Sequence, residues 1–152
     1  MPDIARALAS GTSLKLRYAG SVRPWQHVLE PVSGYLAVAE HLLSGADGGG
    51  WNFGPEHGDV WTVRDVVQTF FQEWGAEVPV QDLAPSELTE TRTLVLDSGL
   101  ARRDLAWTSR WSVAEAVGAS ARWYRAFYSG EDDALTLVER DLAAYFAVPD
   151  GA

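Results

Sequence analysis

The chain has 152 residues, 47% hydrophobic and 22% charged, a composition that is typical of one globular domain and excludes a disordered chain. Twelve basic against 21 acidic residues give a formal net charge of −9, which disfavours electrostatic binding to nucleic acid or to an anionic membrane. With no cysteine, the sequence excludes disulfides, thiolate metal sites and a cysteine nucleophile. The chain contains no long apolar run and no signal-peptide core, so we expect a cytoplasmic protein without a membrane span.

The first sixty residues alternate between helix and strand signals. Glu30 and Pro31 together open a helix, because proline is tolerated in a first helical turn and an acid there suits the positive end of the dipole. A glycine-rich break follows this helix, and Gly54-Pro55 stops the strand after it. The expected elements are a helix over about 3–10, a strand over 14–18, a strand-like aromatic segment over 23–28, a helix over 30–43 and a short strand over 51–53.

The rest of the chain is mainly helical. A serine or threonine followed three residues later by an acid is a helix-start signature, and it predicts helices beginning at Thr62, Ser112 and Thr136. The remaining expectations are strands over 78–80 and 93–96, a short helix from Asp97-Ser98 to Leu105, and an end of the last helix near Phe146. The pattern predicts one mixed α and β domain over residues 1–152.

Several residues that can carry chemistry have plain structural interpretations. His27, His41 and His57 are too scattered for a metal motif, and a hydrogen-bonded structural role is favoured for His27. The glycines over 48–50 neither follow a strand nor open a helix, so they predict a surface loop and not a dinucleotide site. The seven tryptophans occupy mostly apolar positions, and we expect them in the core.

The single lysine of the chain, Lys15, limits the possible chemistry. A Tyr-x-x-x-Lys pair would need a tyrosine at position 11, where the sequence has Gly11. The chain therefore carries no such pair.

Arg23 and Asn52 are the polar residues with the strongest claim to bind a ligand. Arg23 precedes Pro24-Trp25, and its planar guanidinium suits either a phosphate clamp or a structural salt bridge. Asn52 lies between two aromatic residues, and its amide needs a partner that the backbone or a ligand can supply. Both alternatives are open at each position.

Three segments carry a distinctive pattern: R-P-W-Q-H-V-L-E-P over 23–31, G-Y-L over 34–36 and W-N-F-G-P over 51–55. Further matches follow in order at 96–97, 105–107, 111, 123–124 and 127–128, before the G-E-D of 130–132. Together they resemble the CDP-glucose 4,6-dehydratases, which belong to the extended short-chain dehydrogenase/reductase superfamily. The resemblance covers nearly the whole chain but only the C-terminal part of the family's chain.

The resemblance implies a small α/β (or α+β) domain like the C-terminal substrate-binding lobe of these enzymes, without their Rossmann half. In the family that half holds NAD and carries the Tyr-x-x-x-Lys pair, so we expect no catalytic residue, no metal and no cofactor in this chain. NAD would enter only with a separate Rossmann subunit. A separately translated remnant, half of a split enzyme and an excised piece are the three origins that fit.

The resemblance also implies four substrate-binding residues. Arg23 is similar in place to the arginine that grips the diphosphate, and Asn52 resembles the asparagine of the N-x-G strand end that faces it. Glu90 falls where related epimerases bind ribose hydroxyls, and Arg17 matches an arginine near the base and phosphate. The family pattern H-E-x-H reads Thr-Glu-Thr-Arg over 89–92 here, so both histidines are absent.

Two principal functions follow from these observations. The first is a lobe that binds a CDP-linked nucleotide sugar and acts as a dehydratase only with a separate NAD-binding subunit. The second is a stand-alone protein recruited to another small-molecule role in a biosynthetic pathway, and a structural interaction module is a third alternative. A lobe without its nucleotide-binding sheet exposes apolar surface, which predicts a homo-oligomer or an NAD-binding partner.

Overall fold

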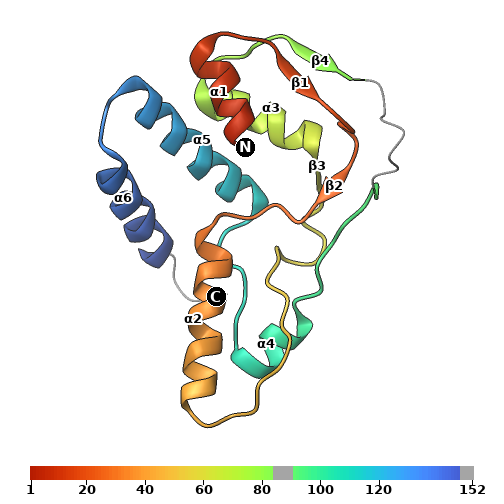
Figure 1. The fold of residues 1–152 in the computed structure, drawn as a ribbon, viewed down its shortest axis with the longest axis vertical. Coiled ribbons are helices and arrows are strands. Elements are labelled where there is room, and N and C mark those ends of the chain that lie inside the picture. Colours follow the sequence, from red (N-terminus) through yellow and green to blue (C-terminus); the bar gives the residue numbers. More distant parts are fainter. Residues whose placement is uncertain (84–90, 148–152) are drawn as a thin grey trace.

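The computed structural model describes residues 1–83 and 91–147. In Figure 1, α1, α3 and α5 pack at one end together with the small sheets, whereas α2 and α4 extend toward the other end. The elements are α1 (Pro2–Ser10), β1 (Leu14–Leu16), β2 (Val22–Arg23), α2 (Leu29–Leu43), β3 (Trp61–Thr62), α3 (Val63–Trp74), β4 (Val80–Asp82), α4 (Gly99–Leu105), α5 (Val113–Ser129) and α6 (Ala134–Ala147). This mixture of helices and short strands confirms the predicted fold class. No helix in these ranges is long and apolar enough to cross a membrane.

The described strands form two small sheets. β1 and β4 run parallel, with Leu14 opposite Val80. β2 and β3 run antiparallel, with Val22 opposite Thr62, and Val22 also makes an isolated parallel bridge to Thr93. Residue 22 therefore lies between two segments that are distant in the sequence.

Several predicted strands are wrong or shorter than expected. The strand over 14–18 ends at Leu16, because Tyr18 has a φ of 53° and turns the chain out of the extended conformation. The strand over 78–80 is displaced to Val80–Asp82. No strand forms over residues 24–28, 51–53 or 94–96, because no described segment pairs with them through a ladder of backbone hydrogen bonds.

The predicted helix starts are confirmed at two of three places. Thr62 and Ser112 each accept a hydrogen bond from the backbone N–H three residues on, and both capping boxes are complete. The start at Thr136 is wrong, because α6 begins at Ala134 and the Thr136 N–H donates to Asp133 Oδ1 at 2.8 Å. An aspartate before the first turn thus takes the capping role that the threonine was expected to have.

The largest core cluster joins α1, β1, α3 and α5, and Phe70 and Val117 at its centre are fully buried. Of the seven tryptophans, Trp107 and Trp111 are buried, and four more are partly buried and packed against core clusters: Trp25, Trp51, Trp61 and Trp74. The expectation of tryptophans in the core is therefore confirmed for two and holds in part for these four. Tryptophan is large and carries an N–H, so one edge often stays near the surface.

The apolar side of α5 is only partly buried. Val113 and Val117 are buried, but Phe127 is 44% exposed. Arg125 of α5 donates to the backbone carbonyl of Trp74, the last residue of α3. The turn of α5 that carries Phe127 therefore extends beyond the end of α3, which covers the earlier turns of α5.

Candidate functional site

Arg23 ends strand β2 and is half-buried. Its Nη1 donates to the backbone carbonyls of Val22 at 2.7 Å and Thr91 at 3.0 Å. These bonds fix the guanidinium beside the segment that follows residue 90. These two contacts give Arg23 a structural role at the end of β2.

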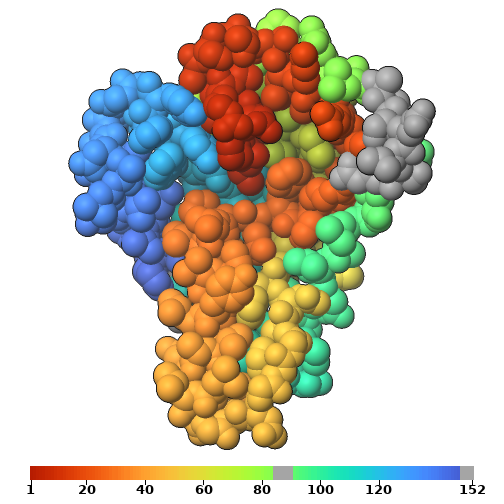
Figure 2. All heavy atoms as spheres, viewed as in Figure 1, coloured from red at the N-terminus to blue at the C-terminus, as the bar shows by residue number. Residues whose placement is uncertain are grey.

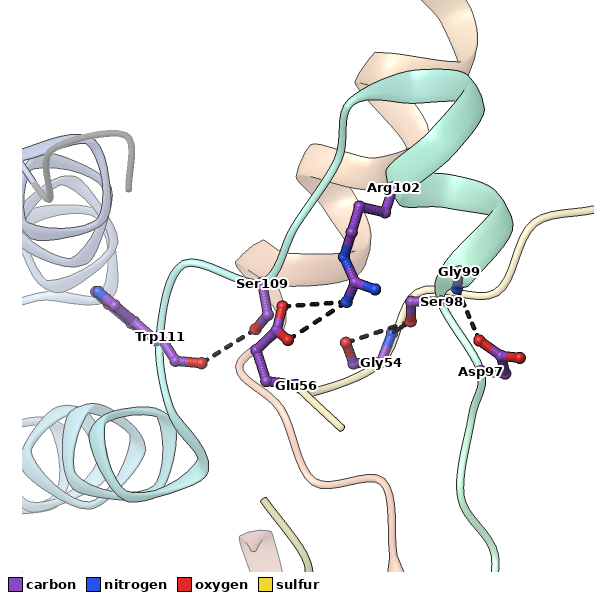
Figure 3. A network of polar contacts seen from close by, with 8 residues as sticks. All are labelled: Gly54, Glu56, Asp97, Ser98, Gly99, Arg102, Ser109 and Trp111. Atoms are coloured by element: carbon purple, nitrogen blue, oxygen red, sulfur yellow. Dashed lines mark hydrogen bonds and ion pairs between the residues drawn. The ribbon is translucent and has the colours of Figure 1, made fainter. Parts of the chain in front are cut away.

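Asn52 is exposed, and its Nδ2 donates to the Asp97 carbonyl at 3.4 Å. The backbone thus supplies a partner for the amide. Figure 3 shows how the neighbouring turn is held: Ser98 Oγ accepts from the Gly54 N–H at 2.9 Å and donates to the Gly54 carbonyl at 3.4 Å. A Cβ at Gly54 would lie 2.8 Å from the Leu96 Cβ, so this close approach requires glycine.

A second contact in Figure 3 secures the loop that follows Asn52. Arg102 of α4 donates to both carboxylate oxygens of Glu56, at 3.3 and 3.4 Å. Asp59 Oδ2 accepts from the Val113 N–H at 2.7 Å, at the start of α5. Both acids of this loop are therefore engaged in holding it against α4 and α5.

This loop and Arg23 line one small cavity of about 130 Å³. His57 also lines this cavity, although its sequence position predicts no role in a site. The only sequence signal for His57 is its position five residues after Asn52, in a loop whose path the sequence does not reveal. Sites for drug-sized ligands measure about 300–1,000 Å³, so this cavity is too small to enclose a whole ligand of that size.

The structure says less about the other two predicted substrate-binding residues, Arg17 and Glu90. Arg17 is exposed just after β1, at the same end of the molecule as β2. Glu90 lies outside the described residues. Arg23 and Asn52 both contact the segment 91–97, at the carbonyls of Thr91 and Asp97. Asn52 does not line the cavity that Arg23 lines.

The nine-residue run over 23–31 acts as a junction between distant segments. Gln26 Nε2 donates to the Phe53 carbonyl at 3.0 Å. His27 is buried, with its Nε2 3.5 Å from Asp141 Oδ2 and its Nδ1 accepting from the Leu29 N–H. The expectation that His27 is a hydrogen-bonded structural histidine is confirmed.

Glu30 has more partners in the structure than its place in a first helical turn predicts. It is fully buried, and its carboxylate accepts from the N–H of Arg110 at 3.1 Å and of Trp111 at 2.8 Å, and from the Tyr145 hydroxyl at 3.0 Å. Burial, with the nearby Glu30 charge, raises the pKa of Tyr145 to about 12. As well as facing the helix dipole, Glu30 therefore ties α2 to α6 and to the segment before α5.

The sequence of this chain is similar to part of a known enzyme. No family model matches the chain. It is 36% identical over 149 residues to the CDP-glucose 4,6-dehydratase of Salmonella typhimurium, which is 97% of this chain and 41% of that protein. The chain matches the C-terminal part of a CDP-glucose 4,6-dehydratase. It spans about two fifths of the length of this relative.

Solved structures of sugar-nucleotide enzymes share the fold. A UDP-glucose 4-epimerase from Stenotrophomonas maltophila with bound NAD superposes with a TM-score of 0.73 at 21% identity, over 85% of this chain and 40% of that one. A dTDP-glucose 4,6-dehydratase from Streptomyces venezuelae with NAD gives 0.71 at 23% identity, over 86% and 39%. The fold is that of the C-terminal part of the extended short-chain dehydrogenases/reductases.

The described residues do not fit an NAD site of the kind that binds at a glycine-rich turn. The glycines over 48–50 follow helix α2 and precede a stretch without helix, so their N–H groups do not join a helix N-terminus. The described sheets have two strands each, of two or three residues. No chemical step through NAD is therefore assigned to this chain.

Proposed function

We propose that this chain provides the nucleotide-sugar-binding lobe of a CDP-glucose 4,6-dehydratase and does not catalyse dehydration on its own. The observation that carries the proposal is the match itself, which takes in 97% of the chain and only 41% of the dehydratase. The part of the relative that the match leaves out is where the resemblance places the NAD site and the catalytic Tyr-x-x-x-Lys pair.

In this proposal the lobe binds and orients the substrate. Arg23 is the main anchor, because a guanidinium can chelate diphosphate oxygens while the overall charge of −9 repels an anion elsewhere on the surface. Arg17 adds a second positive charge near the base and phosphate. Asn52 contributes one hydrogen bond to the diphosphate, and Glu90 accepts hydrogen bonds from ribose hydroxyls.

The chemistry of dehydration lies outside the lobe. NAD, when bound to the remaining part of the enzyme, accepts and returns the hydride. The proton transfers need a positioned base and acid, and the chain has no Tyr-x-x-x-Lys pair to supply them. The contribution of this chain is to hold the sugar nucleotide in place.

The proposal is tested by calorimetry of the purified chain with CDP, UDP and GDP, and by an assay for a 4-keto product with CDP-glucose and NAD. Half of a pocket binds weakly, so we expect a Kd for CDP of ~0.1–1 mM. We expect no 4-keto product above a blank. Turnover by the isolated chain, or no CDP binding at several millimolar, contradicts the proposal.

One observation favours a second function. Arg92 and Thr89 stand where the family has two histidines, so the pattern around Glu90 has changed. This change favours a protein recruited to bind a different small molecule in the same lobe. Tighter binding of UDP or GDP than of CDP, or binding of none of the three, supports this alternative.

A further inference from the structure

A cleft of about 530 Å³ lies between α5, α6, the start of α1 and the segment that follows β2. Figure 2 shows where the red start of α1, the orange segment before α2 and the blue helices α5 and α6 come together. The volume falls within the range of about 300–1,000 Å³ that small-molecule sites occupy. Neither Arg23 nor Asn52 lines this cleft. It is therefore a second candidate site, and the proposed function makes no use of it.

Three aromatic rings line the cleft: Trp25, Trp123 and Tyr124. Each is partly exposed. Neighbouring rings hold Trp123 in place, because it stacks on Phe127 with 5.2 Å between ring centroids and meets Tyr124 edge to face at 5.3 Å. Trp25 and Tyr124 also pack against the largest core cluster. Fixed aromatic rings around a cleft attract a cation, because the faces of the rings carry negative partial charge.

Asp141 of α6 supplies a carboxylate to the same cleft, and its side chain is 20% exposed. Its partner is His27, whose Nε2 lies 3.5 Å from Oδ2. Because Nδ1 of His27 accepts a hydrogen bond from the Leu29 N–H, that nitrogen carries no proton and the ring is neutral. The pair therefore keeps the full negative charge of Asp141.

No positive side chain compensates this charge within the part of the chain that the structure describes. Neither lysine nor arginine lines the cleft. Arg140, the neighbour of Asp141 in the sequence, pairs instead with Asp132 at 2.6 Å. Met1 also lines the cleft, and burial lowers the pKa of its amino group, which reduces the positive charge there. A half-buried carboxylate in this setting favours a cation beside it.

We propose that the cleft binds a small organic cation, a quaternary or substituted ammonium ion. Trp25, Trp123 and Tyr124 surround its alkyl groups, and Asp141 provides the counter-charge. The charge of −9 on the chain also attracts a cation and opposes an anion. The ligand is thus opposite in charge to a nucleotide sugar.

The test compares choline with 3,3-dimethylbutan-1-ol, a neutral alcohol of the same shape, by ligand-observed nuclear magnetic resonance on the purified chain. We expect choline to bind in the millimolar range and roughly 5- to 30-fold more tightly than the alcohol, because a cation–π contact distinguishes the two. A cleft that is merely apolar binds the alcohol at least as well as choline.

Two variants locate the site. Asp141→Asn keeps an acceptor for His27 but removes the charge, so it should weaken choline binding at least fivefold and leave the alcohol unchanged. Trp123→Leu should weaken choline more than the alcohol. Glu139→Gln is the matched control, because Glu139 is an exposed acid of the same helix that does not line the cleft, and it should leave both affinities unchanged. Far-ultraviolet circular dichroism checks that the variants are folded.

Three outcomes overturn the inference: no choline binding at about 100 mM, binding of the alcohol as tight as that of choline, or unchanged choline binding by folded Asp141→Asn and Trp123→Leu. If Asp141→Asn does not fold, Trp123→Leu decides alone. The measurements use no nucleotide, so they are independent of the test of the proposed function.

Discussion

The Tyr145 hydroxyl donates a hydrogen bond of 3.0 Å to Oε2 of Glu30, across 115 positions of sequence and with both side chains buried. The same carboxylate accepts the backbone N–H groups of Arg110 and Trp111. This bond fastens α6 to the start of α2.

Replacing Glu30 by glutamine should destabilise the chain. An amide keeps the shape of the side chain but loses the negative charge and one acceptor, which leaves buried donors unsatisfied. A hydrogen bond to a charged group contributes about 1.5–3 kcal/mol, and we expect a loss of that size in the free energy of unfolding, measured in urea. Glu40→Gln on the exposed side of the same helix is the control and should change it by less than about 0.5 kcal/mol. Equal stability of the two variants contradicts the role of Glu30.

The raised pKa of Tyr145 predicts a loss of stability at alkaline pH. The folded state keeps the phenol protonated up to about pH 12, whereas an unfolded tyrosine loses its proton near pH 10. Between these values the folded state binds more protons, so the free energy of unfolding falls as the pH rises. We expect Tyr145→Phe to remove about 1–2 kcal/mol of this decline between pH 10 and 12. The free energy of unfolding of both proteins is measured in urea as a function of pH. If it falls equally in wild type and Tyr145→Phe, the Tyr145 hydroxyl does not cause the decline.

Arg23→Ala should weaken CDP binding roughly 10- to 150-fold, because one charge-assisted anchor is lost. Ligand-observed nuclear magnetic resonance can follow binding this weak. Arg6→Ala is the matched control, because Arg6 is exposed on α1 and pairs with Asp3. Unchanged binding by folded Arg23→Ala rules out the diphosphate role.

Asp133→Ala should lower the midpoint of thermal unfolding by a few degrees, because the Thr136 N–H loses its acceptor at the start of α6. This backbone hydrogen bond lowers the pKa of Asp133, so the contribution of the cap is lost as the pH falls through that lowered pKa. Glu139→Ala, which removes the acid of the expected but unobserved capping box, should have the smaller effect. A larger decrease in the unfolding midpoint for Glu139→Ala than for Asp133→Ala would indicate that the helix begins at Thr136.

Gly34→Ala should cost about 1–3 kcal/mol, because the added methyl group would lie 2.5 Å from the Phe53 ring in a buried contact. At Gly20 an added Cβ meets nothing within 4 Å, so Gly20→Ala serves as the control. Chemical denaturation of the two variants separates a packing effect from a general effect of replacing glycine. If both variants have the same stability, α2 does not pack on Phe53 as described.

Local patterns in the sequence were enough to predict most helices. The capping boxes that begin at Thr62 and Ser112 depend on residues within a few positions of one another. The nine-residue run over 23–31 was enough to indicate the family, because a match of that length is specific. The sequence also placed Arg23 and Asn52 as candidates, from residue type and neighbours alone.

Tertiary structure decided what those residues do. In the sequence Glu30 is an ordinary acid of a first helical turn, and only the fold brings the Tyr145 hydroxyl and the Trp111 N–H to its carboxylate. In the same way, the fold places Asp141 of α6 beside His27. The segment 51–53 has the composition of a strand, but a strand exists only with a partner for its hydrogen bonds, and none lies within the described chain. The sequence alone thus determined most of the helices and the resemblance to the CDP-glucose 4,6-dehydratases, whereas burial and strand pairing depend on contacts between distant positions.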